Sequence, residues 1–90
     1  MNYLTLDTLN KIKEKYDKDI LLKINMNNFN KIIDIFEQYK LENIKEIVIN
    51  NLLLFLEDYT IINEKISNLS KKYGENLPKH IKEEINLLNI

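Results

Sequence analysis

The sequence predicts an all-α fold: a single helical domain, residues 1–90, with about five helices built on a tandem helical-hairpin repeat. Three observations predict it. Apolar residues recur every three or four positions, a pattern of about 34 residues occurs twice, and helix-ending residues follow the periodic segments. A chain of 90 residues is long enough to bury one modest core.

The repeat is visible when the segment ending at Tyr39 is aligned with the segment ending at Tyr73. At an offset of 34 residues the matched pairs are Leu22 with Leu56, Lys31 with Lys65, Ile32 with Ile66, Ile35 with Leu69 and Tyr39 with Tyr73. At an offset of 35 residues they are Leu6 with Leu41, Leu9 with Ile44 and Ile12 with Ile47. A fixed period of this length is typical of stacked helical units that present an extended surface to a partner.

Two helices are predicted in the N-terminal half. Residues 6–16 place their apolar side chains on one face, and Thr5 or Asp7 is expected to accept hydrogen bonds from the free amides at the start. Residues 28–39 carry a continuous apolar stripe. The asparagines at 25, 27 and 28 favour a turn and a helix start just before it.

Three more helices are predicted in the C-terminal half. The first contains Ile44, Ile47 and Val48. The second ends at Tyr73, with Glu57-Asp58 expected to cap its start and Gly74, the only glycine, expected to end it in a left-handed conformation. Pro78 opens the last helix. Its predicted apolar face comprises Leu77, Ile81, Ile85 and Leu88.

Two short apolar segments, Ile20–Ile24 and Ile47–Ile49, fit a strand as well as a helix. Strands at these positions would flank the central helix and give a β-α-β core. The repeat argues against this alternative, because it aligns the first segment with the run Leu52–Leu56 and not with the second segment.

The longest apolar run, at residues 52–56, covers more than one face of a helix. It is therefore either a buried segment or an exposed interface, and burial is the favoured interpretation. The candidate apolar interface comprises Leu52, Leu53, Leu54, Phe55 and Leu56.

Residues 41–74 contain a short helix pattern, a tight turn, a Leu-rich stretch, a longer periodic helix and a closing glycine. This order resembles an mTERF repeat, the unit of a family named after mitochondrial transcription termination factor, and residues 6–40 form a poorer copy. Asn51 stands where proline is expected, and Lys40 stands where the first copy would have its closing glycine. The resemblance implies an α-solenoid-like fragment whose concave side contacts nucleic acid. The candidate contacts are Lys31, Lys65, Lys71, Lys72, Lys79 and Lys82.

Composition restricts the chemistry. All 13 basic residues are lysine and the net charge is −1, which gives no long-range attraction to nucleic acid. With no cysteine, one histidine (His80) and one glycine, the sequence contains no pattern for a metal site, a cofactor or a phosphate-binding loop. It contains no catalytic motif, so we expect no cofactor and no enzymatic activity. The absence of a signal-peptide pattern and of a membrane-length apolar run predicts a cytoplasmic protein.

These observations predict a small non-enzymatic module that binds or regulates another protein. The abundance of Ile, Asn and Lys indicates an AT-rich genome, and an origin in a phage or mobile element fits such a protein. The first alternative is a nucleic-acid-binding helical-repeat protein that resembles mTERF. The second is a homodimer that associates through Leu52–Leu56.

Overall fold

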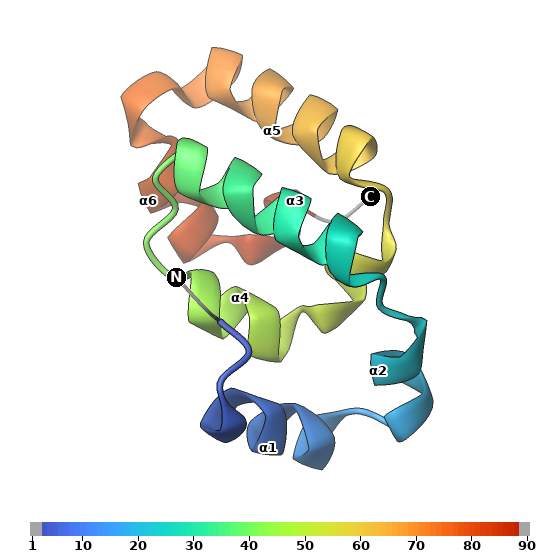
Figure 1. Ribbon diagram of the computed structural model, residues 1–90. Coiled ribbons are helices and arrows are strands. Elements are labelled where there is room, and N and C mark those ends of the chain that lie inside the picture. Colours follow the sequence, from blue (N-terminus) through green and yellow to red (C-terminus); the bar gives the residue numbers. More distant parts are fainter. Residues whose placement is uncertain (1–2, 89–90) are drawn as a thin grey trace.

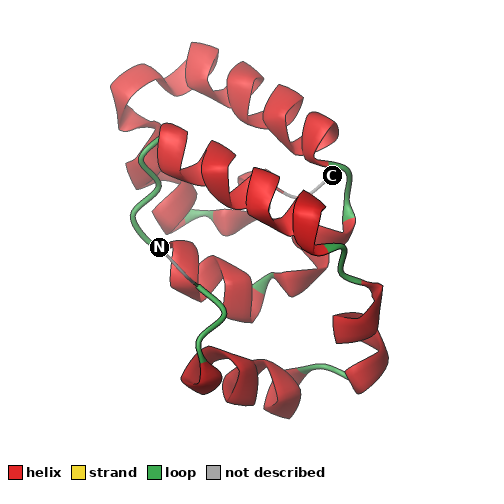
Figure 2. Ribbon diagram, in the orientation of Figure 1, coloured by secondary structure: helices red, strands yellow, loops and turns green. Residues whose placement is uncertain are grey.

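The computed structural model describes residues 3–88, and of Ile85 it describes the backbone alone. Over that range the chain is helical, with no strand, which confirms the all-α prediction (Figures 1 and 2). The described α-helices are α1 (Leu6–Lys15), α2 (Lys18–Lys23), α3 (Met26–Gln38), α4 (Ile44–Asn50), α5 (Tyr59–Tyr73) and α6 (Leu77–Glu83). Three short 3-10 helices complete the order: η1 (Leu52–Leu56), η2 (Gly74–Asn76) and η3 (Ile85–Leu88).

Helices pack side by side in parallel pairs. Helices α3 and α5 both run from right to left in Figure 1. At their amino ends, the Lys31 ammonium lies 4.4 Å from the centre of the Tyr59 ring. Helices α1 and α4 form the second pair: Lys45 Nζ lies 3.7 Å from Asp7 Oδ2 at one end, and Lys15 Nζ donates to Asn50 Oδ1 over 2.6 Å at the other.

The core lies between these pairs and is centred on Phe55, which has no solvent exposure. Its ring centre is 4.7 Å from that of Phe29 and 5.8 Å from that of Phe36, so η1 packs directly beneath α3. Aromatic pairs at these separations add to the stabilisation given by burial. The other fully buried large side chains are Phe36, Ile12, Ile32, Ile47, Val48, Leu52, Ile62, Ile66, Leu77, Ile81 and Leu88.

The predicted helix caps are present. Thr5 Oγ1 accepts from the Thr8 N–H at the start of α1, and Asp58 Oδ1 accepts from the Thr60 N–H at the start of α5. Asn25 Oδ1 accepts from the Asn28 N–H and so begins α3 two residues before the predicted position. Each of these bonds satisfies an amide that has no partner inside its helix.

Helix α5 ends at Gly74, as predicted, with a φ of 58°. Its ψ of −133° lies outside the left-handed helical region, so the predicted left-handed cap holds for φ alone. Lys40, 34 residues earlier, has a φ of 60° after the end of α3. A side chain is disfavoured at such a φ, so glycine would fit this position with less strain than lysine does.

The structure corrects the predicted elements in two places. The segments at 20–24 and 47–49 contribute to α2 and α4, so the β-α-β alternative is wrong, and α2 is an additional helix. The predicted last helix is interrupted at Glu84 and continues as η3. Leu77, Ile81 and Leu88 are buried as predicted, and η3, which carries Leu88, contacts α5. The Ile85 side chain lies outside the described part of the chain.

The order of a longer helix, a short helix and a long helix occurs twice, in α1–α2–α3 and in α4–η1–α5. The short elements α2 and η1 lie 34 residues apart at their starts. This order is compatible with the predicted repeat, which stays a prediction.

Leu54 and Leu53 provide a matched test of this packing. Leu54 is 6% exposed and its neighbour Leu53 is 55% exposed. We expect Leu54→Asp to lower the free energy of unfolding by roughly 3 kcal/mol or more, because it buries an unpaired charge. Leu53→Asp should change it by less than about 1 kcal/mol. Urea denaturation followed by circular dichroism measures both, and equal losses would contradict the described core.

Candidate docking site at the amino ends of α3 and α5

Large apolar side chains are exposed mainly at one end of the molecule. Of the six that stand out in the described residues, Leu6 lies at the start of α1. The other five are Leu22, Met26, Leu53, Leu56 and Ile61, and we call this set the apolar end. They lie on α2, on η1 and in the first turns of α3 and α5, which follow the right side of Figure 1 from α2 near the bottom to α5 near the top.

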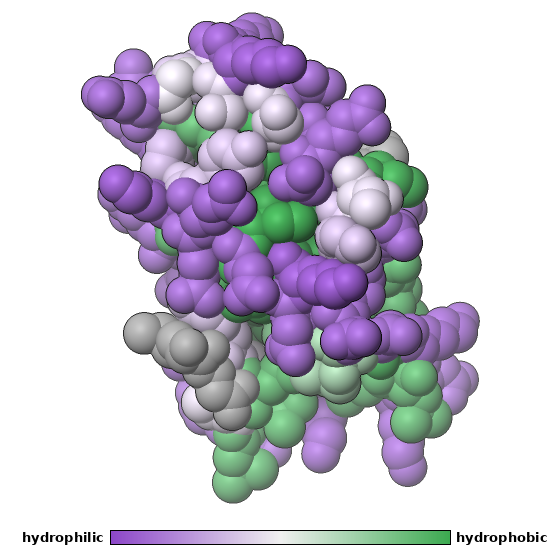
Figure 3. Space-filling view, turned by 45° about the horizontal axis from the view of Figure 1, so that its top comes forward, coloured by the Kyte–Doolittle hydropathy of each residue, from purple (hydrophilic) through white to green (hydrophobic). Residues whose placement is uncertain are grey.

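The faces of the molecule differ in polarity. In Figure 3 the face over α3 and α5 is mostly hydrophilic, whereas hydrophobic residues gather along the lower edge, toward α1 and α2. This edge includes α2, which carries Leu22 of the apolar end, and α1, which carries Leu6 outside it. Exposed apolar surface of this kind can mark an interaction site.

The geometry of η1 explains which leucines are exposed. A 3-10 helix has three residues per turn, so residues i and i+3 lie on the same face. Leu52 and Phe55 are fully buried, while Leu53 and Leu56 are 55% and 39% exposed. Leu52, Leu54 and Phe55 are buried in the core, in agreement with the favoured interpretation of this run, so they are not available to the candidate interface. Leu53 and Leu56 remain as an exposed pair one turn apart.

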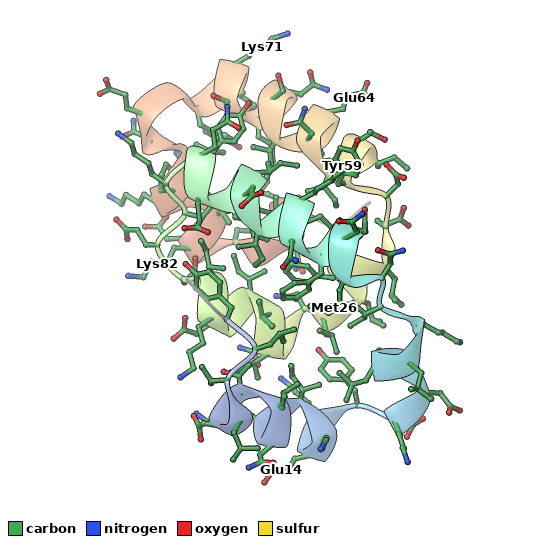
Figure 4. All side chains as sticks on the ribbon, viewed as in Figure 1. Glu14, Met26, Tyr59, Glu64, Lys71 and Lys82 are labelled. Atoms are coloured by element: carbon green, nitrogen blue, oxygen red, sulfur yellow. The ribbon has the colours of Figure 1, made fainter. Side chains whose placement is uncertain are left out.

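An open pocket of about 370 Å³ lies at this end. It is lined by Lys23, Asn25, Asn27, Asn28, Lys31, Phe55, Leu56, Asp58 and Tyr59. Helices α2, α3 and α5 and the 3-10 helix η1 thus all contribute to its wall. Met26 and Tyr59, labelled in Figure 4, mark the starts of α3 and α5 on this side of the molecule.

Asn28 fixes the shape of the pocket. Its Nδ2 donates to the carbonyl oxygens of Phe55 (3.3 Å) and Glu57 (2.6 Å), and its Oδ1 accepts from the Tyr59 N–H (2.8 Å). One side chain on α3 therefore holds the corner at which η1 ends and α5 begins. In the sequence, Asn28 was indicated only as a turn or capping residue, and no local signal separates it from Asn27.

Asp58 and Lys31 set the charge of the pocket. The Thr60 hydroxyl and the Thr60 backbone N–H donate to Asp58 Oδ1, over 2.5 Å and 2.8 Å, and these bonds hold the pKa of the carboxyl below its ordinary value of 3.8. Lys31 lowers this pKa further as a smaller effect. The Lys31 ammonium also lies over the Tyr59 ring, which orients the lysine along the pocket wall.

The predicted lysine contacts do not gather at one place. Lys31 lies at the pocket, Lys65 lies in the middle of α5, and Lys71 and Lys72 lie in its last turn. Because α5 rises 1.5 Å per residue, Lys71 lies about 18 Å along the helix from Tyr59 and hence from Lys31. Figure 4 shows Lys71 and Lys82 on different elements. Lys79 and Lys82 lie on α6, and Lys82 Nζ is 3.7 Å from Glu42 Oε2.

Between residues 3 and 88 no group of three or more histidines and carboxylates is placed to hold a metal ion. No helix in that range is both long enough and apolar enough to span a bilayer. His80 stacks on Tyr73, with ring centres 4.1 Å apart.

No family model, no curated protein and no solved structure matches this chain. The resemblance to mTERF repeats therefore stays a prediction, and the site must be interpreted from its own geometry.

Asn28→Ala tests whether this residue holds the pocket together. Three hydrogen bonds are lost, so we expect the free energy of unfolding to fall by roughly 1–3 kcal/mol. Asn27→Ala is the control, since Asn27 is exposed in the same helical turn. Thermal and urea denaturation compare the two. Equal stability of both variants would show that the corner does not depend on Asn28.

Thr60→Val tests the cause of the lowered pKa of Asp58. The hydroxyl donor is lost while the backbone donor stays, so the pKa of Asp58 should rise toward 3.8 without reaching it. A carboxyl with a lowered folded-state pKa stabilises the fold above its unfolded-state pKa, and this contribution is lost as the pH falls through the folded-state value. Carboxyl-carbon NMR titration measures the pKa directly. An unchanged pKa in the variant would refute the hydroxyl as the main cause.

Proposed function

We propose that this protein is a small protein-binding module, regulatory in character, that docks its partner on the apolar end. The observation that carries the proposal is the exposed pair Leu53 and Leu56 on a turn whose other side chains fill the core. Such residues are poor candidates for chance exposure, because the same turn buries Leu52 and Phe55 completely.

Packing and hydrogen bonds hold the turn beneath the pair in place. Phe55 is held between Phe29 and Phe36, and the Leu52 N–H donates to the Tyr16 hydroxyl over 3.3 Å. Asn28 fixes the carboxyl end of the same turn. Side chains presented from a fixed backbone lose less conformational entropy on binding, which favours affinity for a partner.

The size of the surface favours a separate, transient partner over an obligate dimer. Five partly exposed apolar side chains offer roughly a few hundred Å², the size of the largest patch on many monomers. A standard stable interface buries about 800 Å² per partner, and obligate homodimers usually bury more. We therefore propose a separate protein partner, and a homodimer through this surface is an alternative that the experiment can detect.

Nucleic-acid binding has weaker support. The net charge is −1, and the lysines named from the resemblance are divided among α3, the middle and last turn of α5, and α6. Binding to phosphates depends on several cations acting together along one surface. A protein partner therefore stays the leading proposal.

The test is comparative capture from an extract of the source cells with three purified baits. Wild-type protein and Leu6→Asp should retain the same partner, because Leu6 is 74% exposed but lies outside the apolar end. The double variant L53D/L56D should lose it. The partner is then purified, and its dissociation constant is measured by isothermal titration calorimetry. We expect at least about a hundredfold weakening for the double variant, as for a hot-spot pair.

Two results would contradict the proposal. One is the same set of captured proteins for all three baits. The other is wild-type affinity of the purified partner for L53D/L56D while its circular dichroism shows an intact fold.

A further inference from the structure

We infer that the partner presents an amphipathic helix with an acidic flank, which lays its apolar side chains on Leu53 and Leu56 and a carboxylate toward Lys23 and Lys31. This inference rests on the proposed function and specifies the chemistry of the partner.

The secondary structure of the site indicates which conformation a bound peptide would have. An extended peptide binds by adding a strand to a sheet edge, and the chain has no strand between residues 3 and 88. A Pro-rich peptide needs an aromatic-lined groove, and the Tyr59 ring at this pocket is covered by Lys31. A partner helix that packs its apolar face on exposed apolar side chains is a third mode, and the exposed pair Leu53 and Leu56 on η1 favours it here.

The spacing of the ridge agrees with a helical ligand. Leu53 and Leu56 lie three residues apart in a 3-10 helix, which rises about 2 Å per residue, so they are separated by about 6 Å along its axis. Side chains four residues apart on an α-helix are separated by the same distance of about 6 Å. Leucines of a partner helix at this interval can therefore contact both exposed residues.

The lysines at the pocket favour an acidic residue beside the apolar face of the partner helix. Two lysines, Lys23 and Lys31, line the pocket, and none of the three ion pairs described between residues 3 and 88 includes either of them. Asp58, the carboxylate in the pocket wall, already accepts two hydrogen bonds from Thr60. Asp19 lies one turn before Lys23 on α2, but none of the three described ion pairs joins these two residues. Lys31 already contacts the Tyr59 ring and interacts with Asp58, whereas Lys23 has no such partner among the described contacts, so a carboxylate on the partner would pair most readily with Lys23.

Peptide display tests this inference directly, because it selects ligands by their chemistry alone. A random library of 16-residue peptides is selected on immobilised wild-type protein, with parallel selections on L53D/L56D and on Leu6→Asp. We expect wild type and Leu6→Asp to enrich peptides with aliphatic residues three or four positions apart and a net negative charge. The L53D/L56D protein should not enrich them.

A charge variant then tests the lysine directly. An enriched peptide, synthesised with a fluorophore, should bind Lys23→Glu about fivefold to tenfold more weakly than wild type in an anisotropy titration. Lys71→Glu is the control, because Lys71 is exposed at the opposite end of α5. Raising the salt concentration should weaken wild-type binding more than Lys23→Glu binding.

The outcomes separate this inference from the proposed function. Enriched peptides that depend on Leu53 and Leu56 but are neutral or basic would contradict the inference that the partner is acidic. They would still support docking on Leu53 and Leu56. Enrichment that is equal on L53D/L56D, or no enrichment at all, would overturn both. A concentration-dependent doubling of mass in sedimentation, abolished by L53D/L56D, would identify a second copy as the occupant and also overturn the inference.

Discussion

The burial of Phe55 is the constraint on which the rest of this structure depends. Its ring lies between Phe29 and Phe36 of α3, and this contact fixes the rotation of η1 about its axis. Once that rotation is fixed, the period of three residues places Leu52 in the core and turns Leu53 and Leu56 outward. The same interaction thus stabilises the fold and creates the exposed apolar pair.

The corner after η1 extends this constraint to α5. Asn28 joins α3 to the backbone at Phe55, Glu57 and Tyr59, and Asp58 caps the first turn of α5. Helices α3 and α5 therefore start from a shared polar network and run parallel. Their amino ends open onto one pocket, and the lysines at that pocket face solvent without a described ion pair. This corner therefore determines where the pocket lies and which lysines line it.

The sequence predicted well those features that depend on local chemistry. Thr5, Asp58 and Gly74 act where predicted because capping and positive φ are decided within a few residues. The long helices α3 and α5 were predictable because their apolar stripes extend over several turns. Helix α2 was left open between helix and strand, and the break at Glu84 was missed, since elements shorter than two turns have no measurable period and are fixed by packing.

The candidate site was only partly predictable. Leu53, Leu56 and Lys31 belonged to the predicted candidate residues, but an unbroken apolar run contains no alternation that would separate Leu53 from Leu54. That separation comes from a tertiary contact. Lys23, Tyr59 and Asn28 were not predicted as site residues, because only the folding of α3 against η1 and α5 brings them to one pocket.

The solvent exposure of individual leucine methyl groups tests the central role of η1 most directly. Methyl NMR relaxation in the presence of a soluble gadolinium chelate measures it residue by residue, with Leu22 (76% exposed) and Leu88 (1%) as internal references. We predict strong enhancement at Leu53 and Leu56 and protection at Leu52 and Leu54. Equal enhancement at all four leucines would contradict the claim that η1 presents one apolar pair from a buried support.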